Sequence, residues 1–322
     1  MEDITILVLG DPAEPTLKKL EEAGPGVTLK IAKTAEGLGP EAAAGRVLYS
    51  WSGSRAEIRR VMELAPRLEW IHSRSAGLDS LLFPELIESP IPLTNGSGVF
   101  SQSLGEWVIT GALYFAKDIP RMLKSKAERK WDVFLVSELS TQTMGIVGHG
   151  DIGRAVARRA KAFGMRVLAL RRDTAPRPGD EDVDTVYQTA DLHRMLAECD
   201  YVVAAAPLTP QTKHMLSTAE FNAMKPSAVV MNVGRGPVID EAAIATALSS
   251  GRIRGAVLDV FEAEPLPAES PLWGMENVLI SAHTADHTHT WLNDAVVFFL
   301  EQFARWRSGE PLKNVVDKHA GY

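Results

Sequence analysis

Three glycines, Gly148, Gly150 and Gly153, have G-x-G-x-x-G spacing within the stretch QTMGIVGHGDIGRAVARRAKAFGMRVLALRRD, residues 142–173. An apolar run precedes them, apolar residues at helical intervals follow, and a second apolar run at 166–170 comes next. This order predicts a strand, a tight turn, a helix and a second strand. In such a unit the glycines permit the turn, the approach of a pyrophosphate and close helix packing. Because a helix N-terminus favours anions, the predicted ligand is a dinucleotide.

The end of the second predicted strand bears on which dinucleotide binds. An acidic residue there typically holds the ribose 2′-hydroxyl of NAD, but the position 18 residues after Gly153 is Arg171, followed by Arg172. Two guanidinium groups suit the 2′-phosphate of NADP. Two alternatives stay open: the arginines belong to a solvated basic turn, or Asp173 reaches a ribose hydroxyl and NAD binds.

Strand and helix patterns alternate along the rest of the chain. With 322 residues, 45% of them hydrophobic, the chain is long enough for two cores. Strands are predicted at 4–9, 27–32, 47–50, 69–73, 91–94, 201–205, 228–233, 255–260 and 278–280. We therefore expect an α/β fold with two doubly wound parallel-sheet domains. A Rossmann-type cofactor domain, 101–287, is predicted to be inserted into a flavodoxin-like substrate domain, 1–100 and 288–322.

Composition narrows the expected partners. The net charge of −7 disfavours binding to nucleic acid or to an anionic membrane surface. Cys199 is the single cysteine, so no internal disulfide is possible, and the start MEDITILVLG lacks the basic segment of a signal peptide. No stretch approaches the ~20 apolar residues of a membrane span. We expect a cytoplasmic protein with a small-molecule ligand.

Three polar residues, Arg235, Glu264 and His283, come just after predicted strands of the second domain. Because the carboxyl ends of parallel strands share one edge, these residues are expected to meet. A guanidinium can bind a carboxylate and polarise a carbonyl, while a carboxylate beside a histidine orients the ring and favours its protonated form. The set is suited to giving a proton to a ketone.

A loop of small residues, 74–79, follows a predicted strand of the first domain and leaves backbone N–H groups accessible to an anion, although a plain tight turn is the alternative. Trp51 and Asn95 are expected to line the same pocket, with Trp51 limiting its ligand to two- or three-carbon acids. We expect Arg74 to point outward, because an unpaired arginine in a small cleft is costly to desolvate.

From about residue 45 to 290 the chain resembles the D-isomer-specific 2-hydroxyacid dehydrogenase family. The resemblance is carried by NVGRGPVIDEAAIATAL, GAVLDVFEAEPLP and SPLWGMENVLISAHTA, with GHGDIG and PLTPQT upstream. It implies a homodimeric NAD(P)-dependent oxidoreductase close to the glyoxylate and hydroxypyruvate reductases that prefer NADPH. The product would be a D-2-hydroxy acid. The segment 120–131 is predicted to be basic and helical, and the connection 132–142 that follows it is expected to pack on a second subunit. The resemblance implies that Trp131 reaches the partner's pocket.

The same resemblance implies residue roles. Arg235 would grip the 2-oxo acid, His283 would be the general acid or base, and Glu264 would pair with His283. The residues implied in cofactor binding lie at the glycine turn and at later strand ends: Gly148, His149, Gly150, Asp151, Ile152, Gly153, Arg171, Arg172, Ala206, Pro207, Thr212, Val233, Gly234, Arg235, Asp259 near the nicotinamide, His283 and Ala285. Those implied in substrate binding are Trp51, Ser75, Ala76, Gly77, Asn95, Arg235 and His283.

The chain departs from the family pattern beside the histidine. Ala282 replaces a proline, and Asp286 stands where the family has a small residue, which puts charge near the nicotinamide pocket. His283, His287 and His289 are close in sequence, but no cysteine or carboxylate set completes a metal site, so no metal is predicted. The second class of function left open is a nucleotide-sensing protein on the same scaffold, like the corepressors that resemble this family.

Overall fold

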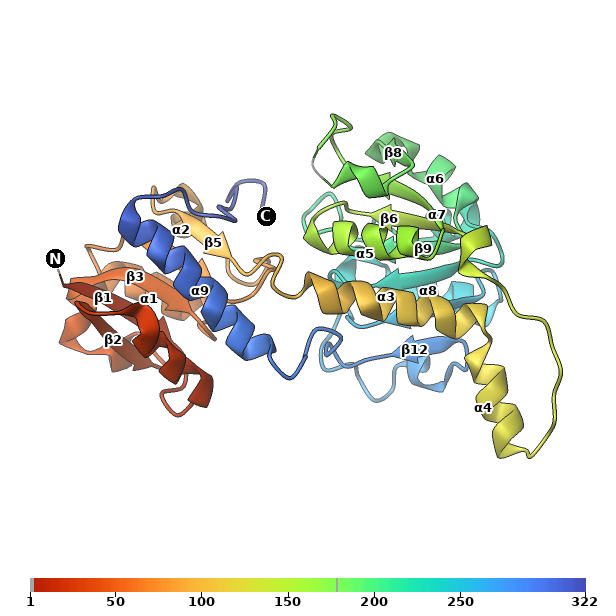
Figure 1. Ribbon diagram of the computed structural model, residues 1–322, viewed down its shortest axis with the longest axis horizontal. Coiled ribbons are helices and arrows are strands. Elements are labelled where there is room, and N and C mark those ends of the chain that lie inside the picture. The colour runs from red at the N-terminus through yellow and green to blue at the C-terminus, as the bar shows by residue number, and fades with distance from the viewer. Residues whose placement is uncertain (1–2, 178) are drawn as a thin grey trace. The chain divides into compact units, whose positions relative to one another are not determined.

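The computed structural model describes residues 3–177 and 179–322, which form two compact units (Figure 1). Unit 1 comprises Met1–Phe100 and His289–Tyr322, and unit 2 comprises Ser101–Thr288. Each unit contains one sheet whose named strands all pair in parallel. The predicted fold class, α/β with two parallel-sheet domains, is confirmed.

The sheet of unit 1 has the strand order β2-β1-β3-β4-β5, which is the flavodoxin-type order. Its strands are β1 (Ile4–Leu9), β2 (Val27–Ala32), β3 (Gly45–Ser50), β4 (Trp70–Ser73) and β5 (Leu93–Asn95). Ser50 pairs with Ser73, and Ser73 pairs with Asn95, so three strands end level with one another. This register places the residues that follow β3, β4 and β5 at one edge of the sheet.

Helices cover both faces of this sheet. On one face, α1 (Arg55–Leu64) and α2 (Pro84–Glu88) bury apolar side chains against the strands. On the other, the 3-10 helix η1 (Pro15–Ala23) and α9 (Trp291–Ser308) pack together (Figure 1). The ring of Phe299 on α9 stacks on that of Tyr49, with centroids 4.1 Å apart. Aromatic packing therefore fixes α9 on the sheet.

The sheet of unit 2 has the strand order β12-β11-β10-β9-β6-β7-β8, in which the winding reverses between β6 and β9 as in Rossmann folds. Its strands are β6 (Thr143–Val147), β7 (Arg166–Leu170), β8 (Thr185–Tyr187), β9 (Tyr201–Ala204), β10 (Val229–Asn232), β11 (Gly255–Leu258) and β12 (Val278–Ile280). In sheets of this kind, ligands bind beyond the carboxyl ends of the strands at the point of reversal.

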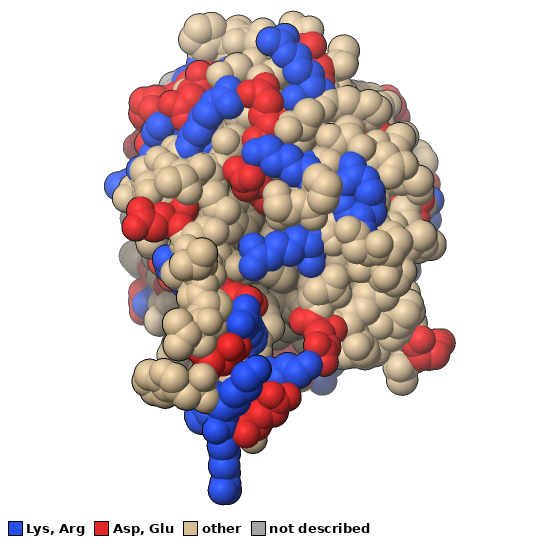
Figure 2. All heavy atoms as spheres, turned by 90° about the vertical axis from the view of Figure 1, so that its right-hand side faces the viewer, with Lys and Arg blue, Asp and Glu red and all other residues tan. Residues whose placement is uncertain are grey.

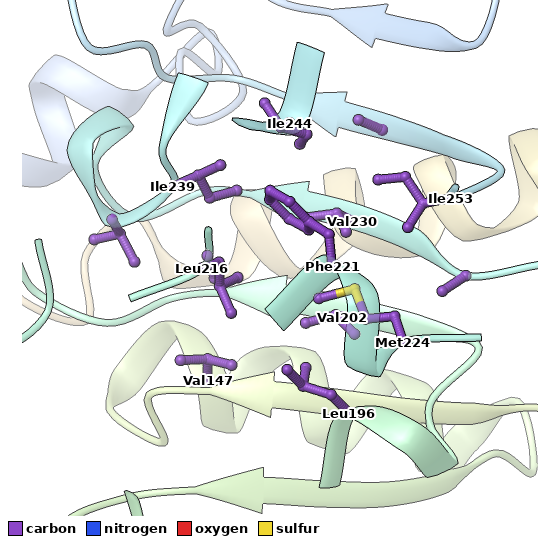
Figure 3. Packing of buried hydrophobic residues seen from close by; sticks show 14 of the residues in the cluster. Val147, Leu196, Val202, Leu216, Phe221, Met224, Val230, Ile239, Ile244 and Ile253 are labelled. Carbon is purple, nitrogen blue, oxygen red and sulfur yellow. The ribbon is translucent and has the colours of Figure 1, made fainter. Parts of the chain in front are cut away.

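Two hydrophobic cores sandwich the sheet of unit 2. The first lies under α6 (Leu192–Glu198), α7 (Thr218–Ala223) and α8 (Glu241–Ser249). Figure 3 shows Phe221 and Leu196 from these helices beside strand residues Val202 and Val230. The second lies under α3 (Ser101–Ala116) and α5 (Asp151–Ala162). Every strand is therefore covered, as the near-continuous apolar runs of the sequence require.

A projecting segment of unit 2 follows α3. Its first part is the helix α4 (Ile119–Ala127), which has no buried residue. Its second part is the extended segment 128–138, and we call this segment alone the arm (Figure 1). Figure 2 shows basic and acidic side chains gathered on this projection. Trp131 and Leu135 on the arm are 94% and 98% exposed. Large apolar side chains this exposed are unusual on a monomer and indicate a contact surface.

Several predictions of local structure were wrong in detail. The helix expected over 120–131 ends at Ala127, so that Trp131 lies on the extended arm. The strand β8 was not predicted, because three residues at a sheet edge carry too short a pattern.

No helix within residues 3–177 and 179–322 has the length and apolarity that crossing a membrane requires.

Candidate active site

The glycine turn joins β6 to α5 in a conformation that side chains would block. Gly148 has φ +99°, and a Cβ added there would lie 2.6 Å from the backbone nitrogen of Ala206. A Cβ on Gly153 would lie 2.3 Å from the carbonyl oxygen of Gly148. A Cβ on Gly150 would meet nothing within 4 Å. The space before the α5 N-terminus, which begins at Asp151, therefore fits a pyrophosphate.

The loop after β7 is held by Arg171, whose side chain is only 7% exposed. Its guanidinium donates to both carboxylate oxygens of Asp180, at 2.6 and 2.7 Å, and to the carbonyl oxygens of Asp173 and Ala175. The hydrogen bonds from Arg171 lower the pKa of Asp180 to about 2. Arg171 therefore fixes the conformation of the loop through buried hydrogen bonds, whereas the side chain of Arg172 is exposed.

His149, the second residue of the glycine motif, is buried beside the same loop. Its Nδ1 lies 3.4 Å from Oδ1 of Asp180, and burial lowers the pKa of the imidazole. Its Nε2 has no hydrogen-bond partner within the described part of the chain. The glycine turn and the β7 loop therefore form one connected surface, linked through Asp180.

Two further strand ends of unit 2 complete this surface. After β9, the hydroxyl of Thr212 donates to the carbonyl of Pro207 at 2.6 Å and accepts from the N–H of Thr209 at 2.8 Å, which closes the loop. After β10, the buried side chain of Asn232 donates to the carbonyl of Arg235 at 3.0 Å. Asn232 also accepts from the N–H of Gly234 at 3.2 Å. These side chains fix the backbone that presents Val233, Gly234 and Arg235.

Asp259, at the end of β11, organises the loop that carries His283. Its side chain is buried, and Oδ1 accepts hydrogen bonds from the Ser281 hydroxyl at 2.6 Å and from the N–H groups of Thr284 and Ala285 at 3.0 and 3.1 Å. Its carbonyl accepts from the N–H of His283 at 2.8 Å. These four hydrogen bonds to Asp259 hold the loop in place. They also keep the backbone of His283 in its left-handed conformation, at φ +53°.

Glu264 and His283 are brought together in unit 2, as expected. Oε2 of Glu264 lies 2.7 Å from Nδ1 of His283, and Oε1 accepts from the N–H of Phe261 at 3.0 Å. The carboxylate is thus anchored on one oxygen and orients the imidazole with the other. Because Nδ1 is engaged, Nε2 is the nitrogen that can exchange a proton with a substrate. The His283 side chain is 44% exposed and can be reached.

Asp286 lies three residues beyond the histidine and is half-buried. Burial, the largest influence, raises the pKa of its carboxyl group, and Oδ1 has no hydrogen-bond partner among the described residues. Nε2 of His287 lies 3.8 Å from Oδ1 of Asp286. Within residues 3–177 and 179–322, no group of three His, Cys, Asp or Glu side chains is arranged to hold a metal ion.

The predicted anion-binding loop of unit 1 follows β4. The carbonyl of Ala76 accepts from the Asn95 amide at 2.7 Å, and that of Ser75 accepts from the Ser73 hydroxyl at 3.2 Å. In the described part of the chain no acceptor binds the N–H groups of Ser75, Ala76 or Gly77. The loop therefore holds its carbonyls inward while three consecutive donors stay available to an anion.

The prediction that Arg74 points outward was wrong. Its guanidinium carbon lies 4.7 Å from the ring centre of Trp51 and 5.2 Å from that of Trp291, and the residue is half-buried. The expected desolvation cost is offset because the faces of indole rings attract a cation. The sequence could not reveal this contact, since Trp291 belongs to a helix more than two hundred residues away.

Four residues that shape these surfaces were not expected from the sequence: Asp180, Asn232, Ser281 and Asn314. The side-chain amide of Asn314, near the C-terminus, donates to the carbonyls of Asn95 and Ser97 at 3.2 and 2.7 Å. Asn232 lies three residues before Arg235, and Ser281 lies two residues before His283. Their closeness to these motifs could have indicated that they help to hold the site. Asp180 begins the short 3-10 helix η5 (Asp180–Asp182) and Asn314 lies in a loop, and neither belongs to a motif.

A sequence profile described as D-isomer specific 2-hydroxyacid dehydrogenase, NAD binding domain, matches residues 109–285. The chain belongs to the D-isomer specific 2-hydroxyacid dehydrogenase family. The family predicted from the motifs is thereby confirmed. A similar member is a glyoxylate reductase of Korarchaeum cryptofilum, 33% identical over 267 residues that make up 80% of this chain and 79% of the relative.

Two solved structures extend the likeness to the whole chain. An NADPH-dependent glyoxylate/hydroxypyruvate reductase from Sinorhizobium meliloti, in complex with NADP and sulfate, is 29% identical, with a TM-score of 0.85 over 99% of this chain and 100% of that one. A D-isomer specific 2-hydroxyacid dehydrogenase from Xanthobacter autotrophicus, in complex with NADPH and MES, is 30% identical, with a TM-score of 0.84 over the full length of both chains.

Proposed function

We propose that this protein is an NADPH-dependent reductase of small 2-oxo acids, including glyoxylate and hydroxypyruvate, that yields D-2-hydroxy acids. The observation that carries the proposal is the Glu264–His283 pair, with 2.7 Å between the carboxylate and Nδ1, in the unit that also holds the glycine turn. The reductases among its relatives support the substrate class. A histidine oriented in this way is suited to donating a proton to a keto oxygen.

The residues of unit 2 fit a nicotinamide dinucleotide. The open space at Gly150 and the α5 N-terminus would hold the pyrophosphate, and the bound nucleotide would supply the hydride to the keto carbon. The other residues proposed to line the cofactor site are His149, Ile152, Ala206, Pro207, Thr212, Val233, Gly234, Asp259 and Ala285. Asp259 would act chiefly by holding the His283 loop.

The 2′-phosphate would be bound mainly by Arg172. Arg171 keeps its guanidinium on Asp180, so its proposed contribution is to hold the loop that presents Arg172. Asp173, the residue that could instead favour NAD, directs its carboxylate to Arg177 at 2.7 Å. This arrangement favours NADP, while NAD still fits the remaining surface.

Each remaining residue has a separate proposed task. His283 would give the proton from Nε2, and Glu264 would keep the ring in the productive orientation. Arg235 would bind the substrate carboxylate and polarise the keto group. The N–H donors of the 75–77 loop would bind the carboxylate as well, and Trp51 would restrict the size of the acid. A nucleotide-sensing role without turnover is not favoured, because it needs no histidine held by an anchored carboxylate.

Arg172→Ala is expected to raise the KM for NADPH about tenfold and to leave the KM for NADH unchanged, because one charge-assisted contact to the phosphate is lost. The wild type is expected to turn over glyoxylate and hydroxypyruvate with a higher kcat/KM for NADPH than for NADH. Steady-state kinetics with both cofactors measure this. Arg158→Ala, an exposed arginine on α5, is the matched control. Equal use of NADH by the wild type would contradict the assignment.

The arm is proposed to form a homodimer with a second copy of this chain. Val133 and Leu135 are 82% and 98% exposed, and together with Trp131 they make an apolar strip that a partner's surface would cover. Trp131 is proposed to reach the partner's substrate site. A cytoplasmic location also stays a prediction, supported by a single, buried cysteine, Cys199.

Val133→Asp combined with Leu135→Asp is expected to convert a dimer into a monomer, because two buried carboxylates would lose hydration at the interface. Sedimentation velocity measures the mass of both proteins. Glu128→Ala, which changes an exposed charge at the start of the arm, should leave the mass unchanged. A wild type that sediments as a monomer at micromolar concentration would refute the proposal.

A further inference from the structure

Residues 311–322, which we call the C-terminal segment, lie beside the strand β5 in unit 1 (Figure 1). The strand order of that sheet ends at β5, so its outer side is open to pairing. The N–H of Val316 donates to the carbonyl of Leu93 at 2.9 Å, and Val315 forms an antiparallel bridge with Thr94. The C-terminal segment therefore covers the edge of the sheet.

Two side chains anchor the C-terminal segment. Gln302 on α9 is buried, and its side chain donates to the carbonyl of Lys313 at 2.6 Å and accepts from the N–H of Lys313 at 3.0 Å. The ammonium group of Lys318 donates to three carbonyls within residues 86–91. Both side chains satisfy backbone groups that water would otherwise bind. Asn314 lies between these two anchors.

Asn314 holds the loop that follows β5. Its side-chain amide donates to the carbonyls of Asn95 and Ser97, at 3.2 and 2.7 Å, because one amide nitrogen carries two hydrogens. The backbone of Asn314 has φ +55°, a left-handed conformation that asparagine adopts more readily than most residues. The two hydrogen bonds fix the path of the chain directly after β5.

The loop after β5 holds the 75–77 loop in turn. The side-chain amide of Asn95, which is buried, donates to the carbonyl of Ala76 at 2.7 Å. The N–H of Gly96 donates to the carbonyl of Ser75 at 3.3 Å. Two successive sets of hydrogen bonds therefore link the C-terminal segment to the loop whose N–H groups are proposed to bind the substrate carboxylate.

We infer that Asn314 is a positioning residue for substrate binding, which acts through Asn95 to hold the 75–77 loop in the arrangement that receives the carboxylate of a 2-oxo acid. The inference rests on the proposed reductase function and adds the C-terminal segment to the support of its substrate site. Loss of the Asn314 amide displaces the N–H donors without removing them. The ground state and the transition state then lose the same contact, so that KM for the acid rises while kcat changes little.

Two variants of Asn314 test the inference. Asn314→Gly removes the amide and still accepts the left-handed backbone, whereas Asn314→Asp keeps the shape and turns an acceptor toward the same two carbonyls. With NADPH and hydroxypyruvate, KM for the acid is expected to rise about tenfold in Asn314→Gly and further in Asn314→Asp. In both variants kcat stays within about twofold, and KM for NADPH is unchanged.

A binding measurement makes the test independent of turnover. The probe is oxamate, an unreactive analogue of a small 2-oxo acid, and its Kd is measured by calorimetry on the NADPH-bound protein. The Kd is expected to rise by the same factor as KM. If the wild type reduces no 2-oxo acid while the Kd for oxamate still rises in Asn314→Gly, the reductase function fails and the positioning role stands.

Lys318→Met is the matched control, since Lys318 anchors the same segment on carbonyls outside the loop after β5. It is expected to lower Tm and to leave KM for the acid unchanged, because a smaller folded fraction reduces only the apparent kcat. Asn95→Ala with Asn314→Gly should raise KM no further than Asn95→Ala alone, since both changes act on one path. An unchanged KM and Kd in a folded Asn314 variant, or additive effects in the double variant, would overturn the inference.

Discussion

His283→Ala is expected to lower kcat for the reduction of a 2-oxo acid by a factor of about 10² to 10⁴. The variant loses the ring whose Nδ1 lies 2.7 Å from Glu264 and whose Nε2 is left to donate the proton. The Kd for NADPH, measured by fluorescence titration, should change by less than about threefold, because the glycine turn and the β7 loop are untouched. The prediction thus separates a loss of chemistry from a loss of binding.

The matched control is His289→Ala, an exposed histidine of the same stretch of chain. Its kcat should equal that of the wild type. Glu264→Gln should give an intermediate kcat, because the amide keeps the shape but no longer supports a charged imidazole. Near wild-type kcat in His283→Ala would remove the histidine from the mechanism, and a large rise in the Kd for NADPH would mean that it serves cofactor binding instead.

Asp259→Ala is expected to lower kcat by about 10²-fold and the free energy of unfolding by about 3 kcal/mol. Its carboxylate is buried and accepts from the Ser281 hydroxyl and from the N–H groups of Thr284 and Ala285, all of which would lose their acceptor. The loop would then release His283 from its left-handed backbone conformation. Urea denaturation and steady-state kinetics on the same preparation measure the two effects.

Ser281→Ala is a graded comparison, because it removes one of the three donors to Asp259 and keeps both backbone contacts. It should lose about 1 kcal/mol of the free energy of unfolding and at most about fivefold in kcat. If Asp259→Ala lowered stability but left kcat intact, the loop would not need Asp259 to place His283. Asp259 would then be a structural residue only.

The sequence predicted best those parts of the site that local backbone geometry determines. The turn at Gly148 and Gly153 could be predicted because any side chain there would strike the backbone of its own unit. The meeting of Glu264 with His283 followed from a rule about parallel sheets, in which strand ends converge at one edge. Both features depend on the path of the backbone or on the direction of a strand. Patterns of apolar and small residues in the sequence indicate these two properties.

The long arginine side chains were beyond such rules. Arg171 was expected to bind a 2′-phosphate and Arg74 to point outward, yet the first turns inward onto Asp180 and the second stacks on Trp51 and Trp291. A flexible side chain binds whichever partner the fold places near it. The segment that contains Asp180 has no periodic pattern of apolar residues from which its position could be predicted. Their positions depend on packing between distant segments, and a single sequence does not specify it.

The most direct test of the proposed function follows a labelled hydride. The wild-type protein is supplied with NADPH deuterated on the transferring face of nicotinamide C4 and with a small 2-oxo acid such as hydroxypyruvate, and the product is examined by NMR and chiral chromatography. The account predicts continuous turnover, deuterium at C2 of the hydroxy acid, and the D enantiomer. Binding of NADPH without turnover of any 2-oxo acid, or a product without deuterium at C2, would contradict it.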